Sequence, residues 1–175
     1  GKSGCDFLAA NIFKIKKEKG IDITVVNGEN SAQGNGMTKQ SAEFLLANGA
    51  DVITTGNHSF KRRESVSIYE ENDVVLRPSN YPEGVIGKGV TTLDMGRFSV
   101  AIINLMGVVY MEPIGNPFDE ADRLLKEIDT PNIFVDFHAE ATAEKKCMGQ
   151  YLKGRVTAVM GTHTHVQTAD ETIID

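Results

Sequence analysis

The stretch DVITTGNHSF (Asp51 to Phe60) begins as an apolar, β-branched run and ends in a polar GNH segment. Continuous runs of this kind are typical of strands that are buried on both faces of a sheet. The same order recurs at DITVV (22–26) before NGEN, at NIFVDF (132–137) before HAEAT and at VTAVM (156–160) before GTHTH. The sequence therefore predicts an α/β fold with a largely parallel, covered sheet.

Amphipathic segments between these runs predict helices that flank the strands. TKQSAEFLLANG is expected to begin with Thr38 as its N-cap and to stop at Gly49. DEADRLLKEI and EKKCMGQYLK predict two more helices, and KIKKEKG predicts the exposed face of another. TTLDMGRFSVAIINL predicts two strands joined by a tight turn at residues 94–97. Two prolines and three glycines predict a loop over residues 77–89.

The length, composition and net charge indicate a globular protein and argue against a membrane or nucleic-acid partner. With 175 residues, 41% hydrophobic and 24% charged, the chain is expected to form one domain over residues 1–175. No apolar run approaches the roughly 20 residues of a membrane helix, so no membrane partner and a cytoplasmic location are expected. The net charge of −6 disfavours nucleic acid as a partner. Cys5 and Cys147 are expected to be reduced thiols, and the oligomeric state, including a homo-oligomer, stays open.

Metal-binding groups follow four of the predicted strands. In open α/β sheets the ligand crevice lies outside the carboxyl ends of the strands, so these groups are expected at one edge of the fold. All four histidines of the chain are among them. The set comprises Glu29, Asn30, Asn57, His58, His138, His163 and His165.

Each of these residues also has an ordinary explanation. His138 alone is more often a hydrogen-bonded core histidine, Glu29 alone a capping or solvated carboxylate, and Asn57 after glycine a turn residue. Those explanations must all hold independently at one edge of the sheet, and we therefore favour a metal site.

The spacing in GTHTH supports that interpretation. Residues i and i+2 of an extended segment point to the same side, so His163 and His165 are expected to reach one cluster while Thr162 and Thr164 point away. Imidazole, carboxylate and amide donors suit manganese, iron or zinc and fit calcium poorly. Seven such donors are too many for one tetrahedral zinc ion and predict two divalent ions bridged by Glu29. We expect these ions to be Fe or Mn, with Zn as the alternative.

The charge of such a site predicts a phosphate substrate. Two divalent ions bring four positive charges, and Glu29 cancels one of them. A metal pair of this kind generates hydroxide near neutral pH and stabilises both the attacking and the leaving oxygen of an in-line displacement. We therefore expect a substrate that carries a phosphate group.

The motifs NGEN, GNH, HAEAT and GTHTH, in that order, resemble the calcineurin-like metallophosphoesterases, and more narrowly their YmdB-like branch. The phrases NGENSAQGNGMT, DVITTGNHSF, LRPSNYP and GTHTHVQTADE extend the resemblance along essentially the whole chain. The resemblance implies a sandwich-like α/β phosphoesterase fold. It also implies hydrolysis of phosphodiesters, with cyclic nucleotides such as 2′,3′-cyclic AMP as substrates.

The resemblance also implies roles for single residues. Glu29 would bridge the two metals, with Asn30, Asn57, His138, His163 and His165 as the other ligands. His58 would donate the proton that the leaving alkoxide needs, a role that suits an imidazole because it titrates near neutrality. A further ligand, or a residue that orients a ligand, is the alternative role of His58.

The sequence departs from the family pattern at its ends and at a few motif positions. The family opens with a strand that ends in a metal-binding aspartate, and Gly1 to Gly4 resembles the residues just after it. A fragment that lacks this ligand and a C-terminal part is therefore expected. Cys5, the NHSFKR segment and Val108 differ from the usual family residues, which bears on substrate preference.

Other functions stay open beside the cyclic-nucleotide phosphodiesterase. One is a phosphomonoesterase or RNA-processing nuclease on the same metal core, with a basic rim at Lys61, Arg62 and Arg63; a solvated helix start is the favoured interpretation of that rim. Another is a regulatory protein with a vestigial metal site. The retained His58 counts against that option, because sensing needs ligands and no proton donor.

Overall fold

A computed structural model describes residues 1–174 of the chain. The chain divides into two compact units, which are described separately. Unit 1 comprises Gly1–Arg77 with Ile86–Lys88, and unit 2 comprises Pro78–Val85 with the chain from Gly89 onward.

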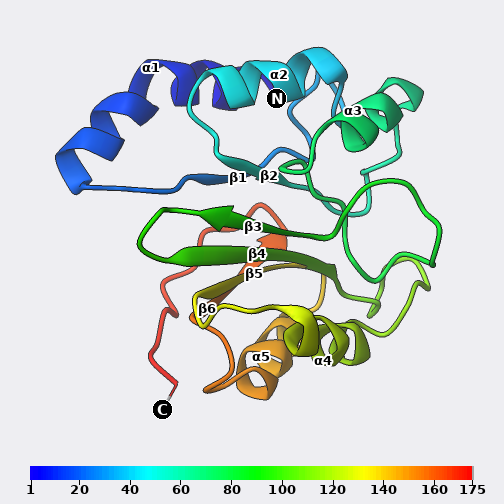
Figure 1. The fold of residues 1–175 in the computed structure, drawn as a ribbon. Coiled ribbons are helices and arrows are strands. Elements are labelled where there is room, and N and C mark those ends of the chain that lie inside the picture. The colour runs from blue at the N-terminus through cyan, green and yellow to red at the C-terminus, as the bar shows by residue number, and fades with distance from the viewer. Residues whose placement is uncertain (175) are drawn as a thin grey trace. The chain divides into compact units, whose positions relative to one another are not determined.

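Unit 1 contains a parallel pair of short strands and the helices that pack on it (Figure 1). Its elements are α1 (Lys2–Lys19), β1 (Val25–Asn27), α2 (Lys39–Ala47), β2 (Val52–Thr54), the 3-10 turn η1 (Arg63–Ser65) and α3 (Val66–Glu71). The three helices lie on one side of β1 and β2. They bury a core to which Met37, Leu45, Ile53, Ile68 and Val75 belong.

Local chemistry sets the ends of the helices in unit 1. The Thr38 side chain accepts a hydrogen bond from the backbone N–H of Ser41, and the Ser41 hydroxyl accepts one from the N–H of Thr38. This reciprocal capping box begins α2 where the sequence predicted. Gly49 follows its end with φ 98°, a left-handed conformation that costs glycine least. Gly20, with φ 64°, ends α1 in the same way.

Unit 2 is built on a four-stranded sheet in the order β3-β4-β5-β6. Its elements are β3 (Val90–Asp94), β4 (Ser99–Met106), α4 (Pro117–Glu127), β5 (Ile133–Ala139), α5 (Thr142–Tyr151) and β6 (Ala158–His163). β3 and β4 form the predicted antiparallel hairpin, whereas β4, β5 and β6 run parallel. The α/β class and its mixed, mainly parallel sheets are thus confirmed.

Helices α4 and α5 cover one face of the unit 2 sheet (Figure 1). Alternate residues of β4 and β5 supply that face, including Ile103, Leu105, Val135 and Phe137. Leu124 of α4 and Met148 of α5 pack against them, and both helices match predicted segments. Asn116 caps α4 by accepting a hydrogen bond from the N–H of Phe118.

The loop over residues 77–89 contains no helix or strand, as predicted, but it is firmly attached. Asn80 is buried, its amide nitrogen donates to the carbonyls of Met106 and Gly115, and its amide oxygen accepts the N–H of Met106. These bonds pair the backbone N–H and carbonyl of Met106 at the end of β4. They also hold the loop around Asn80 against the rest of unit 2.

Two expectations drawn from the apolar runs alone were wrong. The strands form two sheets, with β1 and β2 in one and β3 to β6 in the other. The rule that strand ends share one edge therefore applies within each sheet separately. Burial on both faces also fails at β3 and β6, which are edge strands of their sheet; Met160 of β6 is 48% exposed. Among residues 1–174, no helix is long and apolar enough to span a membrane.

Gly28 generates a prediction about the packing of unit 1. A Cβ atom at Gly28 would lie 2.6 Å from Cγ2 of Ile53 and 3.1 Å from Cδ1 of Leu45. Gly28→Ala should therefore lower the free energy of unfolding by about 1–3 kcal/mol through overpacking. Gly4→Ala is the matched control, since its Cβ would meet no atom within 4 Å and α1 would gain helix propensity. Thermal unfolding followed by circular dichroism measures both, and equal midpoints for Gly28→Ala and wild type would contradict the packing.

Candidate metal centre

In unit 1, the parallel pairing of β1 and β2 brings two polar loops together. Asn27 pairs with Thr54 at the end of the register, so the chain after each strand emerges at the same edge. Glu29 follows β1 and is 2% exposed, and its Oε1 accepts the backbone N–H of His58 at 2.8 Å. The same oxygen lies 3.7 Å from Nδ1 of the His58 ring. The predicted residues Glu29 and His58 thus meet.

Asn30 completes this cluster. Its Oδ1 accepts the N–H of Gly36 at 3.1 Å, which identifies this atom as the amide oxygen, and its Nδ2 donates to Glu29 Oε2 at 3.3 Å. Nδ1 of His58 lies 3.1 Å from the same Oδ1. Since an amide oxygen can only accept, the hydrogen of that contact belongs to Nδ1 of His58. The Nε2 atom is therefore the nitrogen through which His58 can exchange a proton with another molecule.

Asn57 precedes His58 on the loop after β2 and is partly buried. Gly56 before it accepts hydrogen bonds from both the backbone N–H and the hydroxyl of Ser59, so a tight turn carries Asn57 and His58. Asn57 as a ligand stays a prediction.

In unit 2, His138 lies near the end of β5, and its ring is fully buried. The register of the parallel pair places His138 beside Thr162 of β6. Nδ1 of His138 lies 3.0 Å from the Thr162 hydroxyl oxygen. That hydroxyl also donates to Oδ1 of Asp136 at 2.6 Å, so a buried carboxylate stands behind the histidine.

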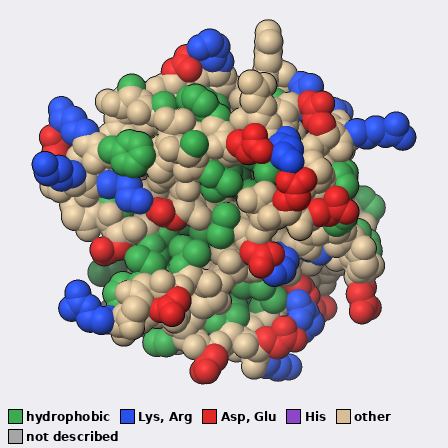
Figure 2. Space-filling model, turned by 45° about the horizontal axis from the view of Figure 1, so that its top comes forward, with side chains coloured by type: hydrophobic (Ala, Val, Ile, Leu, Met, Phe, Trp, Pro, Cys, Tyr) green, Lys and Arg blue, Asp and Glu red, His purple; other side chains and the backbone are tan. Residues whose placement is uncertain are grey.

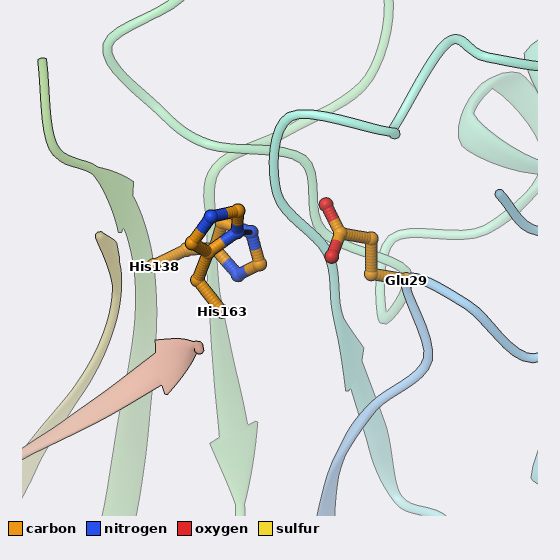
Figure 3. A group of neighbouring side chains, drawn as sticks. All are labelled: Glu29, His138 and His163. Atoms are coloured by element: carbon orange, nitrogen blue, oxygen red, sulfur yellow. Dashed lines mark hydrogen bonds between the residues drawn. The ribbon is translucent and has the colours of Figure 1, made fainter. Parts of the chain in front are cut away.

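His163 faces the other nitrogen of His138. Its Nδ1 lies 3.1 Å from Nε2 of His138, and the two rings meet nearly edge to face, with an interplanar angle of 73° (Figure 3). Nε2 of His163 is 2.9 Å from the Glu140 carboxylate. Figure 3 also draws Glu29, whose carboxylate comes from the loop after β1.

The expected alternation along GTHTH does not hold. The segment is not extended, because φ is 97° at His163 and 54° at His165. These left-handed residues end β6 and break the rule that i and i+2 share a side. The hydroxyl of Thr162, expected to point away from the cluster, instead contacts His138. His165 is exposed and stays a predicted ligand.

Charged side chains surround the histidine pair of unit 2. Nζ of Lys145 donates to the Thr164 hydroxyl at 3.2 Å. Burial lowers the pKa of the Lys145 ammonium, while the carboxylates of Glu140 and Asp136 act to raise it. One ammonium and two carboxylates leave this region with a negative balance, which suits a bound cation.

The histidine pair fits the ligand set of a transition metal. Metal–nitrogen bonds are about 2.1 Å long, so two nitrogens 3.1 Å apart can share one ion. Nδ1 of His138 is hydrogen-bonded to the Thr162 hydroxyl, which in turn donates to the Asp136 carboxylate. Histidine ligands commonly have such a hydrogen-bond partner on the nitrogen that does not bind the metal. These donors therefore suit a divalent transition metal.

Sequence reasoning missed Asp136, Thr162 and Glu140, all of which contact the histidines or their partners. Asp136 carried a signal, since it lies two residues before His138 on the same strand and therefore on the same face. Thr162 could not be identified as a partner of His138 without the β5–β6 register.

In the basic segment after GNH, Arg62 is hydrogen-bonded to backbone carbonyls of the same chain. Arg62 donates from Nε to the carbonyl of Asn35 at 2.9 Å and from its terminal nitrogen to the carbonyl of Gln33. Arg62 is thus used to hold the loop that follows Glu29 and Asn30. The favoured interpretation, a helix start, agrees with η1 beginning at Arg63.

Known proteins resemble this chain along its whole length. A 2′,3′-cyclic-nucleotide 2′-phosphodiesterase of Bacillus subtilis (strain 168) is 43% identical over 99% of this chain and 67% of its own. A crystal structure of a hypothetical protein from Thermus thermophilus has a TM-score of 0.91 at 39% identity, over 97% of this chain and 66% of its own. A crystal structure of a novel phosphatase from Mycoplasma pneumoniae has a TM-score of 0.89 at 32% identity, over 97% of this chain and 63% of its own.

The chain spans about two thirds of the length of these relatives. The family model for the YmdB-like protein matches residues 1–175, which agrees with the resemblance of the GEN, GNH and GTHTH motifs. The chain therefore belongs to the YmdB-like protein family.

Proposed function

We propose that this protein is a metal-dependent phosphodiesterase that hydrolyses small cyclic nucleotides such as 2′,3′-cyclic AMP. The observation that carries the proposal is the imidazole pair of the buried His138 and the partly buried His163, with ring nitrogens 3.1 Å apart. The similarity to a 2′,3′-cyclic-nucleotide 2′-phosphodiesterase supports the substrate class. We further propose that residues 1–175 form one calcineurin-like metallophosphoesterase domain in which the sheets form a sandwich. The protein would act in the cytoplasm.

Glu29, His138 and His163 would each offer one ligand atom to the metal centre. The carboxylate of Glu29 would bridge two ions, Fe or Mn, and Asn30, Asn57 and His165 would complete the ligands. Such a pair supplies a hydroxide at neutral pH and neutralises phosphate charge. The amide oxygen of Asn30 already accepts two N–H groups, so a role as ligand requires it to share or exchange them.

His58 would supply the proton for the leaving sugar oxygen. Its Nδ1–H is held by the amide oxygen of Asn30, and Nε2 is the atom that delivers the proton. When the P–O bond to the sugar breaks, the oxygen keeps the bonding electrons and takes the hydrogen on Nε2 of a doubly protonated His58, which leaves the ring neutral with its hydrogen on Nδ1. The backbone N–H of His58 donates to Glu29, which fixes the position of the imidazole relative to a predicted ligand.

A small substrate is favoured over RNA. Arg62 is engaged with backbone carbonyls and does not form a free basic rim with Lys61 and Arg63. On the face drawn in Figure 2, basic and acidic side chains are interspersed and form no basic stripe. Together with the net charge of −6, these features argue against a surface that follows a long phosphate backbone.

Glu29→Gln tests the bridging carboxylate. The amide keeps the size of the side chain and removes the negative charge, so we expect bound Mn²⁺ and hydrolysis of 2′,3′-cyclic AMP to fall by more than about 100-fold. Glu43→Gln, an exposed carboxylate of α2, is the matched control and should change neither. Metal content by mass spectrometry and product release by chromatography give the two readouts. Wild-type metal content in Glu29→Gln would contradict the role of Glu29.

His58→Asn tests the proton donor. Asparagine keeps an N–H near the position of Nδ1 and removes Nε2, so kcat for 2′,3′-cyclic AMP should fall by about 10²- to 10⁴-fold while bound Mn²⁺ is retained. A nitrophenyl phosphodiester serves as the control substrate, because its leaving group needs no proton and its hydrolysis should be much less affected. Equal losses on both substrates, or loss of the metal, would show that His58 has another role.

A further inference from the structure

We propose that Asp136 and Thr162 are positioning residues that hold His138 in the Nδ1–H tautomer and so direct its Nε2 toward a metal ion. This inference rests on the proposed function, since it assigns a purpose to two side chains that are not ligands themselves. All the contacts that carry it lie within unit 2.

The direction of the hydrogen bonds follows from the number of hydrogens available. An ionised carboxylate can only accept, so the single hydrogen of the Thr162 hydroxyl is given to Asp136 over 2.6 Å. The Thr162 oxygen then has only lone pairs left for His138, 3.0 Å away. The hydrogen of that second contact must come from Nδ1 of His138. A neutral imidazole with a hydrogen on Nδ1 carries its lone pair on Nε2.

The sheet makes this arrangement specific. Asp136 and His138 are two residues apart on β5 and lie on the same face, and Thr162 is the register partner of His138 on β6. Asp136 is 5% exposed and His138 is fully buried. Polar groups at such depth must be hydrogen-bonded, and the Asp136–Thr162–His138 series satisfies all three.

The series also affects the strength of His138 as a ligand. The carboxylate of Asp136 acts through the hydroxyl on Nδ1–H and raises the electron density at Nε2, as carboxylates behind metal-bound histidines do. Nε2 of His138 is the nitrogen that faces His163. The lone pair is thus presented on the side where the second imidazole lies, and in the metal-free protein it accepts the hydrogen of the 3.1 Å contact from Nδ1 of His163.

The test uses the full chain and compares three variants. Thr162→Val keeps the shape and removes the hydroxyl, Thr162→Ser restores it, and Thr164→Val makes the same change at a threonine whose hydroxyl binds Lys145 instead. Long-range ¹H–¹⁵N NMR of metal-free protein reports which ring nitrogen of His138 carries the hydrogen. Isothermal titration with Mn²⁺ alone reports affinity.

We expect the Nδ1–H tautomer in wild type, Thr162→Ser and Thr164→Val. In Thr162→Val the Nε2–H tautomer should rise, because Nδ1 of His163 can accept its hydrogen, and Mn²⁺ affinity should fall by about 10- to 100-fold. Should Thr162→Val not fold, Asp136→Asn carries the affinity test, with a loss expected in the same direction.

Two results would overturn the inference: an Nε2–H tautomer in the wild type, or Thr162→Val with the tautomer and Mn²⁺ affinity of Thr164→Val. Failure of the proposed function looks different. Wild-type protein that binds Mn²⁺ normally but does not hydrolyse 2′,3′-cyclic AMP would count against the phosphodiesterase, while the tautomer and affinity measurements would still decide the roles of Asp136 and Thr162.

Discussion

Parallel pairing of β5 with β6 is the constraint on which the chemistry of unit 2 depends. It sets His138 beside Thr162 and leaves His163 one residue further along, at the end of the strand. A shift of the register by one residue would place a different side chain beside Nδ1 of His138. The hydrophobic residues of β5 that face α4 and α5 resist such a shift, since Val135 and Phe137 would exchange places with Asp136 and His138.

Burial of a polar side chain costs free energy unless the side chain is hydrogen-bonded, and this applies to the predicted site residues of each unit. Glu29, Asp136 and His138 are all at most 5% exposed. Each is hydrogen-bonded to a backbone or side-chain partner: Glu29 to the N–H of His58, and Asp136 and His138 to the Thr162 hydroxyl. Removing one partner of a buried group costs about 1–3 kcal/mol, more for a charge. These side chains are therefore held in place before any ligand binds.

Local features of the fold could be predicted because neighbouring residues decide them. The Thr38 cap of α2, the stop at Gly49 and the β3–β4 hairpin were each confirmed, and each depends on residues close in sequence. The apolar runs alone did not indicate the division into two sheets, because they indicate strands without indicating which strands pair; more than one sheet was expected only from the resemblance to a sandwich-like fold. The family resemblance was confirmed over residues 1–175. It predicted the protein family and the substrate class, which local sequence patterns do not indicate.

The candidate site was predictable in part. Strand ends correctly indicated that Glu29 and His58 meet in unit 1 and that His138 and His163 meet in unit 2. The orientation of Thr162 and the left-handed turn at His163 and His165 could not be read from the sequence, because they depend on the β5–β6 register and on where β6 ends.

We expect side chains that are distant in sequence to bind the same metal ions. Anomalous diffraction from crystals grown with Mn²⁺ tests it most directly. The expected result is an ion ligated by Nε2 of His138, by a nitrogen of His163 and by the carboxylate of Glu29. Manganese bound elsewhere, with His138 and His163 still joined only to each other, would contradict it.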